Sequence, residues 1–576
     1  MASYERASSQ ALGIVEILHH ISSYLENDDL INAIQVCKNW HTSLRSRLFC
    51  NIVVSYIPKD DSDTATVPSF KNVQANSHKI RSLAIIHRPP FKKFVEYLKL
   101  RDLSNLERFA WVRSEGGCHI ARDHWRRFLD FLRANGSTLK EINIEYHNPA
   151  EIVQLWKVLV QHCTSLQHLR IKRVPVREND LPWFWLACRK LVSLEMDVID
   201  LVWPNLPGLV RSFNAEAKRL QEILDLEEPK VISGSLKRKA SEDLDDASEN
   251  KTEYLLPYMK RLLFYGDTHR GEVIELMKEC PRLESFNACL DGRFFQALAL
   301  ESAWPNLHSI SLVSGFLDED MARLIMLLNP HIDPRDYRQL VANKSKRLLK
   351  TLWVPGTMFG RDCLNVLIFH RHTETLVHLN IKGSTLRGYS IITILKSCPR
   401  LKSLVAPVLH AAYISEDRDR PWVCLGLERL IMGIEFSPNG CAPTVSRRES
   451  KLPTVEEMEQ DCLNQLCRLH RLKVLIMGGY ANGYRPFMSL SLKLDHGLRQ
   501  LYGLRELEVV SSIGSSVEEQ DVEWMAEHWR RLRRVKYNYC HINLPRDRTK
   551  WWAKWYVRSL ARNQDIWLYQ KRFEFL

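Results

Sequence analysis

The sequence predicts an α/β solenoid, in which short parallel strands form one layer and helices form another, preceded by a small all-α module at the amino terminus. Three observations lead to this fold class. The chain has 576 residues, several times the size of a single domain. A short apolar pattern recurs along most of it, and helix-forming stretches separate the recurrences. A repetitive architecture is therefore favoured over several unrelated domains.

The recurring pattern is an apolar residue, two variable residues, a second apolar residue, one variable residue and, in most copies, a third apolar residue. The last two apolar positions are two residues apart, so both side chains face the same side of a short strand and enter a core. Each copy therefore predicts one strand. The copies start at Ile80, Leu106, Leu139, Leu166, Leu191, Met259, Leu283, Leu307, Leu349, Leu376, Leu401, Leu427, Leu472, Leu504 and Leu532.

The stretches between these strands predict helices. WRRFLDFLRANGST before Leu139 and IVQLWKVLVQHCTS before Leu166 carry apolar residues three and four apart. Four cysteines each lie three residues before the start of a copy, where a helix gives way to a strand. This phase predicts buried, reduced thiols rather than disulfides or metal ligands at Cys163, Cys188, Cys280 and Cys398.

Because the copies recur at about 20 to 29 residues in most cases, the chain resembles leucine-rich-repeat proteins over residues 77–545. The resemblance implies a horseshoe with parallel strands on the concave side and helices on the convex side. Residues 227–252 and 433–460 are polar and charged, which predicts disordered insertions. Residues 314–346 keep the apolar run MARLIMLL, which predicts an extra helix.

The amino-terminal residues 1–55 predict a separate module of three short helices, with apolar residues on one face of each. Its sequence resembles the F-box: Glu-Ile-Leu in the first helix, Tyr-Leu at its end, then Asp-Leu, then Val-Cys-Lys followed by Trp. The resemblance implies binding of the Skp adaptor of a cullin-RING (SCF) ubiquitin ligase. The residues assigned to this contact, or to the small core beneath it, are Ile17, Leu18, Ile21, Leu25, Leu30, Val36, Cys37 and Trp40.

The repeats are expected to hold the target protein on the concave sheet, through the side chains that alternate with the apolar pair. Many of these side chains are basic or aromatic, which suits an acidic or phosphorylated segment. Glutamates and aspartates occupy equivalent positions elsewhere, so the predicted surface is mixed. The assigned residues are His168, Arg170, Lys172, Arg261, Tyr265, Trp353, His378, Asn380 and Lys382.

The net charge of +13 is concentrated near the carboxyl terminus. Residues 546–576 interleave tryptophans with basic side chains, which predicts a cap that seals the last repeat. A site for nucleic acid or a phosphorylated ligand is the alternative. Lys237, Arg238 and Lys239 are consistent with a nuclear import signal. Without a signal peptide or an apolar run long enough for a membrane span, the expected location is the cytoplasm, the nucleus or both.

Enzyme motifs are missing from the sequence: no GxxxxGK, GxSxG or HExxH occurs. His370 and His372, in FHRHTE, are interpreted as two surface histidines rather than a metal pair. We therefore expect no catalytic residue, no metal and no cofactor. The predicted function is a substrate-recognition subunit of an SCF ligase. A repeat scaffold with a degenerate F-box stays the alternative, because Gly13 and Ile14 stand where the family has Leu-Pro.

Overall fold

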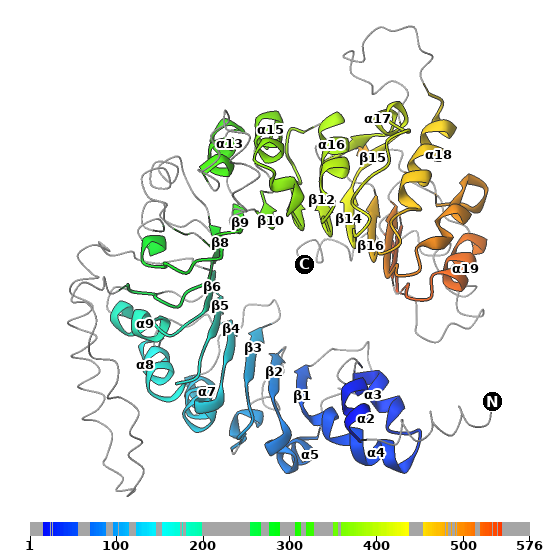
Figure 1. The fold of residues 1–576 in the computed structure, drawn as a ribbon. Coiled ribbons are helices and arrows are strands. Elements are labelled where there is room, and N and C mark those ends of the chain that lie inside the picture. Colours follow the sequence, from blue (N-terminus) through cyan, green and yellow to red (C-terminus); the bar gives the residue numbers. More distant parts are fainter. Residues whose placement is uncertain are drawn as a thin grey trace, which may run out of the picture. The chain divides into compact units, whose positions relative to one another are not determined.

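The chain forms two compact units, residues 1–283 and residues 284–576, called unit 1 and unit 2 below. Each is described by itself (Figure 1). The computed structural model describes residues 15–22, 25, 27–55, 69–87, 96–101, 103–113, 122–145, 152–172, 176, 180–197, 254–265, 273, 276–288, 304, 306–312, 318–327, 349–354, 359–386, 388–436, 453–477, 480–481, 485–486, 490, 492–512, 519–532, 534–537 and 540–543.

Unit 1 begins with three short helices and continues into a parallel sheet. The helices are α2 (Val15–Ser22), α3 (Asn27–Ala33) and α4 (Lys38–Leu44), followed by the 3-10 helix η1 (Arg45–Phe49). Each strand pairs with the next one along the chain, all in parallel. The strands are β1 (Asn51–Ser55), β2 (Ser82–His87), β3 (Arg108–Arg113), β4 (Glu141–Glu145), β5 (His168–Lys172), β6 (Ser193–Asp197) and β7 (Arg261–Tyr265).

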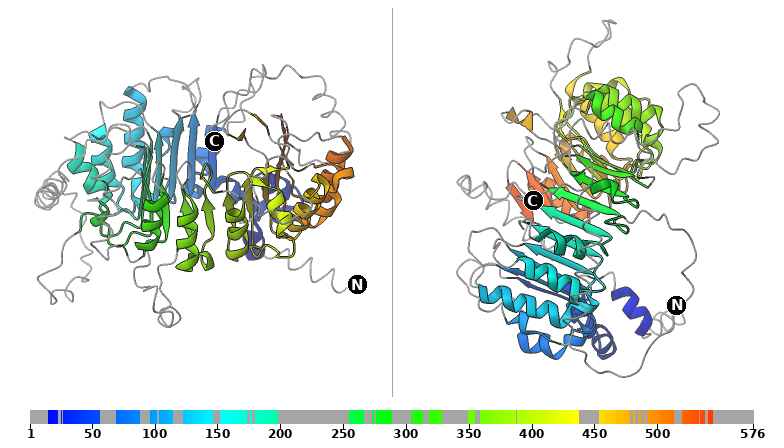
Figure 2. Two further views of the ribbon diagram at one scale, coloured as in Figure 1. Left: turned by 90° about the horizontal axis from the view of Figure 1, so that it is seen from above. Right: turned by 90° about the vertical axis from the view of Figure 1, so that its left-hand side faces the viewer.

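The helices of unit 1 that follow the strands lie on one side of its sheet, as the cyan helices in Figures 1 and 2 show. They bury large aromatic side chains against the strands, among them Trp125, Trp156 and Trp185, each at most 1% exposed. These helices, with the short 3-10 turns between them, are α5 (Phe70–Ala75), η2 (Ser77–Lys79), η3 (Tyr97–Lys99), α7 (Arg122–Asn135), η4 (Gly136–Thr138), α8 (Ile152–His162) and α9 (Leu181–Cys188).

One hydrogen-bond device repeats at the amino-terminal edge of the sheet. The carbonyl of the residue that precedes a strand accepts two backbone N–H groups from the next strand, as Arg81 does from Glu107 and Arg108 at 2.8 and 2.9 Å. Lys140 does the same for the next pair of repeats, with Gln167 and His168. The device locks the register of neighbouring repeats, so the apolar positions of each strand fall on the same face.

Unit 2 repeats this arrangement with shorter strands. Its sheet orders β8 (Ser285–Ala288), β9 (Ser309–Leu312), β10 (Thr351–Trp353), β11 (His378–Asn380), β12 (Ser403–Val405), β14 (Arg429–Met432), β16 (Val474–Met477), β19 (Val509–Ser512) and β20 (Arg534–Tyr537), all parallel. The last strand, β21 (Cys540–Asn543), is antiparallel to β20. Two small pairs accompany the sheet: β13 (Leu409–His410) with β15 (Ile434–Glu435), and β17 (Tyr480–Ala481) with β18 (Arg485–Pro486).

The helices of unit 2 also lie along one side of its strands (Figure 1). They are α13 (Asp318–Leu327), α15 (Arg361–Phe369), α16 (Tyr389–Ser397), α17 (Ala412–Glu416), α18 (Val455–Leu466) and α19 (Glu519–His528), with the 3-10 helices η7 (His372–Glu374), η8 (Leu494–His496) and η9 (Leu498–Gly503). Each unit is therefore a solenoid of leucine-rich-repeat type, with a strand layer and a helix layer, as the sequence predicts.

Asp318 connects two repeats of unit 2 by capping a helix that is not its own. Its carboxylate accepts backbone N–H groups from Gly360 at 2.8 Å, Asp362 at 3.0 Å and Cys363 at 3.1 Å, at the start of α15. Burial acts to raise the pKa of Asp318, but the side chain of Cys363 and then these backbone hydrogen bonds outweigh it and hold the pKa below its ordinary value. A Cβ at position 360 would collide with this carboxylate, which explains the glycine there.

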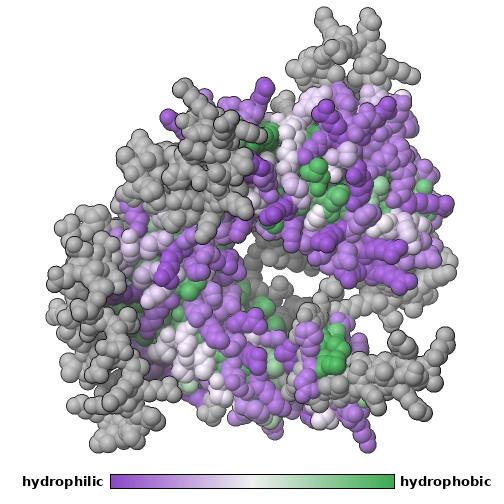
Figure 3. Space-filling view, viewed as in Figure 1, coloured by the Kyte–Doolittle hydropathy of each residue, from purple (hydrophilic) through white to green (hydrophobic). Residues whose placement is uncertain are grey.

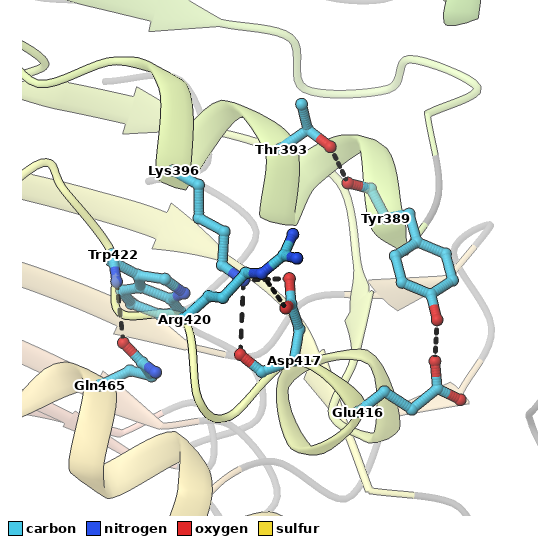
Figure 4. Close-up of polar contacts among 8 residues, drawn as sticks. All are labelled: Tyr389, Thr393, Lys396, Glu416, Asp417, Arg420, Trp422 and Gln465. Atoms are coloured by element: carbon cyan, nitrogen blue, oxygen red, sulfur yellow. Dashed lines mark hydrogen bonds and ion pairs between the residues drawn. The ribbon is translucent and has the colours of Figure 1, made fainter.

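Further polar contacts join α16, α17 and α18 on the helix side of unit 2 (Figure 4). Lys396 on α16 forms an ion pair with Asp417, just after α17. The hydroxyl of Tyr389 donates to Glu416, which raises the pKa of Tyr389 to about 12. The amide Oε1 of Gln465 on α18 accepts the backbone N–H of Trp422 at 3.0 Å, and both residues are buried. These contacts fix neighbouring helices to one another.

Substituting Gln465→Leu is expected to lower the free energy of unfolding by about 1 to 3 kcal/mol, because the buried N–H of Trp422 loses its acceptor. Chemical denaturation followed by circular dichroism measures this loss. The matched control is Gln460→Leu on the same helix, whose exposed amide contacts Asn464 and Gln500 and should change stability by about 0.5 kcal/mol or less. Equal losses in the two variants would contradict this role for the buried acceptor.

Every copy of the apolar pattern coincides with a strand, and the extra helix predicted within 314–346 is α13. Three details of the prediction were wrong. The sheet starts at β1, inside the range assigned to the amino-terminal module. The predicted insertion 433–460 contains β15 and the first half of α18. In the copy starting at Leu504, the buried residue is Val510 rather than Val509.

The four cysteines predicted to be buried at helix-to-strand turns are buried, at 2% exposure or less. Burial raises the pKa of each of these thiols, to about 12 for Cys163 and Cys398, so they stay protonated and packed in the core. The predicted insertion 227–252, the basic triplet at 237–239 and the predicted cap at 546–576 lie outside the described residues.

Candidate functional site

The three amino-terminal helices enclose a small apolar core. Its fully buried members are Leu18 of α2, Leu30 and Ala33 of α3, and Leu44 of α4. Partly buried apolar side chains pack against this core: Leu25, Ile34, Trp40 and Leu48. Leu30, Ala33 and Ile34 are three and four residues apart, so one face of α3 is committed to the core.

The helices are fixed to the first strands of the sheet. The guanidinium Nε of Arg47 in η1 donates to Ser22 Oγ at the end of α2, at 3.2 Å. The carbonyl of Cys50 then accepts the backbone N–H groups of Arg81 and Ser82, both at 2.9 Å. Because η1 runs directly into β1, the helical module is held by the same register device as the repeats.

An apolar surface remains exposed on this module. The exposed fractions are 38% for Ile17, 45% for Ile31 and 65% for Val36, while Cys37 beside Val36 is also exposed. Figure 3 shows hydrophobic side chains gathered over the amino-terminal helices on the face seen there. Apolar side chains with this exposure, on a module with so small a core, are typical of a surface that binds another protein.

The structure divides the predicted adaptor residues into two groups. Leu18 and Leu30 belong to the core, Leu25 and Trp40 pack against it, and Ile21 is half-buried. The exposed group consists of Ile17, Val36 and Cys37. Ile31 was missed as a site residue. The signal for it was present, because Ile31 follows Leu30 directly and so points away from the Leu30, Ala33 and Ile34 face.

The sheet of unit 1 brings five of the predicted target-binding residues onto one face, the face turned away from the helices, called the helix-distal face below. His168, Arg170 and Lys172 lie along β5, and the register places them beside Ser193, Glu195 and Asp197 of β6. Beyond β6, Arg261 and Tyr265 are exposed on β7. Arg170 Nε forms an ion pair with Glu195 Oε1 at 2.8 Å. The face is mixed in charge, as expected.

Sequence reasoning missed exposed apolar residues on the same face of unit 1. Val53 on β1 is 48% exposed and Ile86 on β2 is 37% exposed. The register runs from Val53 to Ala84 and on to Ala110 of β3, so this end of the face is apolar. The signal was present, because Phe49, Ile52 and Val54 have the spacing of the apolar pattern, but residues 1–55 were assigned to the amino-terminal module.

Unit 2 brings together the other predicted target-binding residues. Trp353 of β10 pairs in register with Asn380 of β11, and His378 lies two residues earlier on that strand. Lys382 is exposed just after β11, and its backbone N–H donates to Asn380 Oδ1 at 3.1 Å. Trp353 is 51% exposed.

His370 and His372 are buried rather than on the surface, so that interpretation was wrong. His372 is 0% exposed and connects two backbone groups: its Nδ1 accepts the N–H of Leu349 at 3.2 Å, and its Nε2 faces the carbonyl of Ile325 at 3.3 Å. Since Nδ1 accepts, the proton sits on Nε2 and donates to that carbonyl. Its role is therefore structural.

The described part of the chain holds no group of three or more His, Cys, Asp or Glu side chains placed to bind a metal. Within that same part, no helix combines the length and the apolar character that crossing a membrane requires.

Comparison with protein families finds a match to the F-box-like family over residues 15–54. No curated protein sequence matches. Among solved structures, an internalin from Listeria monocytogenes aligns with 84% of this chain and 92% of its own, at 11% identity and a TM-score of 0.26. A structure of the Drosophila Toll–Spätzle complex aligns with 86% of this chain and 56% of its own, at 11% identity and a TM-score of 0.28.

The family match covers the three helices, η1 and most of β1, the same residues that carry the small core and the exposed apolar surface. The chain therefore combines an F-box-like domain at residues 15–54 with a solenoid of leucine-rich-repeat type.

Proposed function

We propose that this chain is the substrate-recognition subunit of an SCF-type ubiquitin ligase, acting in the cytoplasm or the nucleus. The F-box-like domain docks onto the Skp adaptor, and the helix-distal faces of the solenoid hold the protein to be ubiquitinated. The chain itself supplies no nucleophile.

The observation that carries this proposal is the division of the F-box-like domain into core and surface. The core of the domain already buries Leu18, Leu30, Ala33 and Leu44. The core does not bury Ile17, Ile31 and Val36, so a partner can bury their exposed apolar area. F-box domains generally bind Skp adaptors, which makes this adaptor the partner of first choice.

The mechanism is proximity. The register device and η1 connect the F-box-like domain to β1 and β2 without a flexible linker among residues 27–55. A target held on the sheet is thereby kept near a ubiquitin-conjugating enzyme bound to the same ligase. Its lysines then react at a high effective concentration.

Reconstitution tests the proposal. The purified chain is mixed with the Skp adaptor, with and without the cullin-RING core, and the mixtures are separated by size-exclusion chromatography. We expect the chain to co-elute with the adaptor alone and with the assembled core. Separate elution from the adaptor at micromolar concentrations would overturn the proposal and favour a repeat scaffold whose F-box is degenerate.

A further inference from the structure

The helix-distal face of unit 2 differs in chemistry from that of unit 1. Two rows of side chains run across it in register, and their members alternate with the core residues of each strand. From β8 to β19 the first row contains Ser285, Ser309, Thr351, His378, Ser403, Arg429, Val474 and Val509. The second row contains Asn287, Ser311, Trp353, Asn380, Val405, Ile431, Ile476 and Ser511.

These two rows contain hydroxyls, amides, apolar groups and a cation, but no carboxylate between Ser285 and Ser511. The corresponding rows of unit 1 carry Glu141 and Glu145 on β4 and Glu195 on β6. An anionic ligand therefore meets no carboxylate within the rows of unit 2, whereas in unit 1 it would meet two on β4 and one on β6, the last paired with Arg170.

Cations surround the centre of this face. Arg429 is exposed within the first row, and Lys350 and Lys402 are exposed at the amino-terminal edge of the sheet. The nearby Glu428 lies 2.7 Å from Lys473 and 3.6 Å from Lys402, so lysines already engage this carboxylate. Among the residues that the structure describes, Lys350 and Arg429 form no ion pair, so both are free to pair with a ligand.

Trp353 adds an apolar platform at the same place. Its side chain is 51% exposed, in register between Ser311 and Asn380. Exposed tryptophans in protein interfaces are often the residues on which binding energy concentrates. His378, on the next strand, has its pKa lowered first by burial and then by Lys402. It therefore contributes hydrogen bonds rather than a charge at neutral pH.

The amide oxygen of a buried asparagine in the second row lacks a hydrogen-bond donor. Asn287 is 5% exposed, and its Oδ1 accepts no hydrogen bond in the structure. Buried polar atoms are nearly always satisfied, so this oxygen is left as an acceptor in the second row. The backbone of an extended segment supplies both donors and acceptors at the spacing of a strand.

We propose that the helix-distal face of unit 2, between β8 and β14, binds an extended acidic segment of the target protein, with one apolar side chain of that segment packed on Trp353. This inference deepens the proposed function, because it assumes that the solenoid captures a target. Carboxylates or phosphates of the segment pair with Arg429 and Lys350, and its backbone meets the serines and asparagines of the two rows.

The test uses the full chain and a fluorescein-labelled twelve-residue peptide, in which a central leucine is flanked by alternating glutamate and serine. Fluorescence anisotropy should show binding that weakens with salt, because the ion pairs are exposed. Trp353→Ala and Arg429→Glu should each weaken it at least about tenfold. The matched control is Arg418→Glu, the same charge reversal at an exposed residue just after α17, on the helix side of unit 2, which should leave the affinity unchanged.

Equal binding of a peptide with glutamine in place of glutamate would overturn the acidic specificity. Undetectable binding of the glutamate peptide, or equal weakening by Arg418→Glu and Arg429→Glu, would overturn the assignment of the segment to this face. Adaptor binding is measured on the same samples. If the adaptor still binds while the peptide result is negative, only this inference fails; if the adaptor does not bind, the proposed function fails separately.

Discussion

Replacing Ile31 and Val36 together by glutamate is expected to weaken binding of the Skp adaptor by about a hundredfold or more. Each substitution removes an apolar side chain that docking would bury. Burial of one such partly exposed side chain contributes on the order of 1 kcal/mol to binding. Each also places a carboxylate in an apolar interface, which adds a desolvation penalty of about 1 kcal/mol or more. Over the two substitutions these losses sum to about 4 kcal/mol, or nearly three orders of magnitude in affinity.

The matched control for this pair is Val53→Glu. Val53 is also an apolar, exposed residue of unit 1, at 48%, but it lies on the helix-distal face of β1. Titration calorimetry of each variant with the adaptor should show that Val53→Glu binds like the wild type. Circular dichroism checks that all variants are folded. Full affinity of the double variant would refute docking through this surface, as would an equal loss in the control.

Leu30 and Trp40 are poor choices for the same experiment. Leu30 is 4% exposed inside the core of the F-box-like domain, and Trp40 packs against that core. Truncating Leu30 to alanine would cost about 2 to 5 kcal/mol of stability. A loss of adaptor binding in such a variant could arise from unfolding of the domain. Substitutions at the exposed Ile31 and Val36 test the contact with the adaptor itself.

Unit 2 is expected to lose about 3 kcal/mol of stability as the pH falls from about 6.5 to about 4, because of His372. Burial lowers the pKa of His372 to about 4, assisted by His370 and opposed by the hydrogen bond to the Ile325 carbonyl. The unfolded chain has the ordinary pKa near 6.5 and binds the proton first. The contribution of the neutral imidazole is thus fully present above pH 6.5 and is lost as the pH falls towards 4.

The control is His372→Gln, which can still accept the N–H of Leu349 and donate to the Ile325 carbonyl but does not titrate. Denaturant unfolding of both proteins between pH 7 and pH 4 gives the comparison. The wild type should lose more stability than the variant over this range. The remaining slope in the variant comes from other groups, including His370, whose pKa burial also lowers. Identical pH profiles would show that His372 does not contribute.

The repeat could be predicted from sequence because its apolar pairs obey the period of a strand. Leu169 and Ile171, or Leu379 and Ile381, are two residues apart, so a core on one side of the sheet is their simplest arrangement. β1 was not predicted although Phe49, Ile52 and Val54 have the spacing of the pattern, because residues 1–55 were assigned to the amino-terminal module. The sequence did not identify Val510 as the buried residue, because Val509 fits the pattern equally well. The pairing of Val509 with Val474 and of Val510 with Leu475 decides which of the two faces the core.

The candidate site could be predicted as a set of residues but not as a surface. In helices as short as α2 and α3, apolar residues lie on more than one face, and sequence alone does not say which face packs inward. Ile17 and Leu18 are adjacent, yet one is 38% exposed and the other 1%. Likewise, nothing in FHRHTE distinguishes a surface pair from His372 buried beneath Leu349. Tertiary packing supplied both answers.

The most direct test of the account is hydrogen exchange of the full chain, measured by mass spectrometry with and without the Skp adaptor. The central claim is that α2, α3 and α4 form the docking surface. Adaptor binding should therefore slow amide exchange in peptides covering residues 15–49 and leave the strands of unit 2 unchanged. Unchanged exchange in residues 15–49, or protection confined to the sheet of unit 2, would contradict the claim.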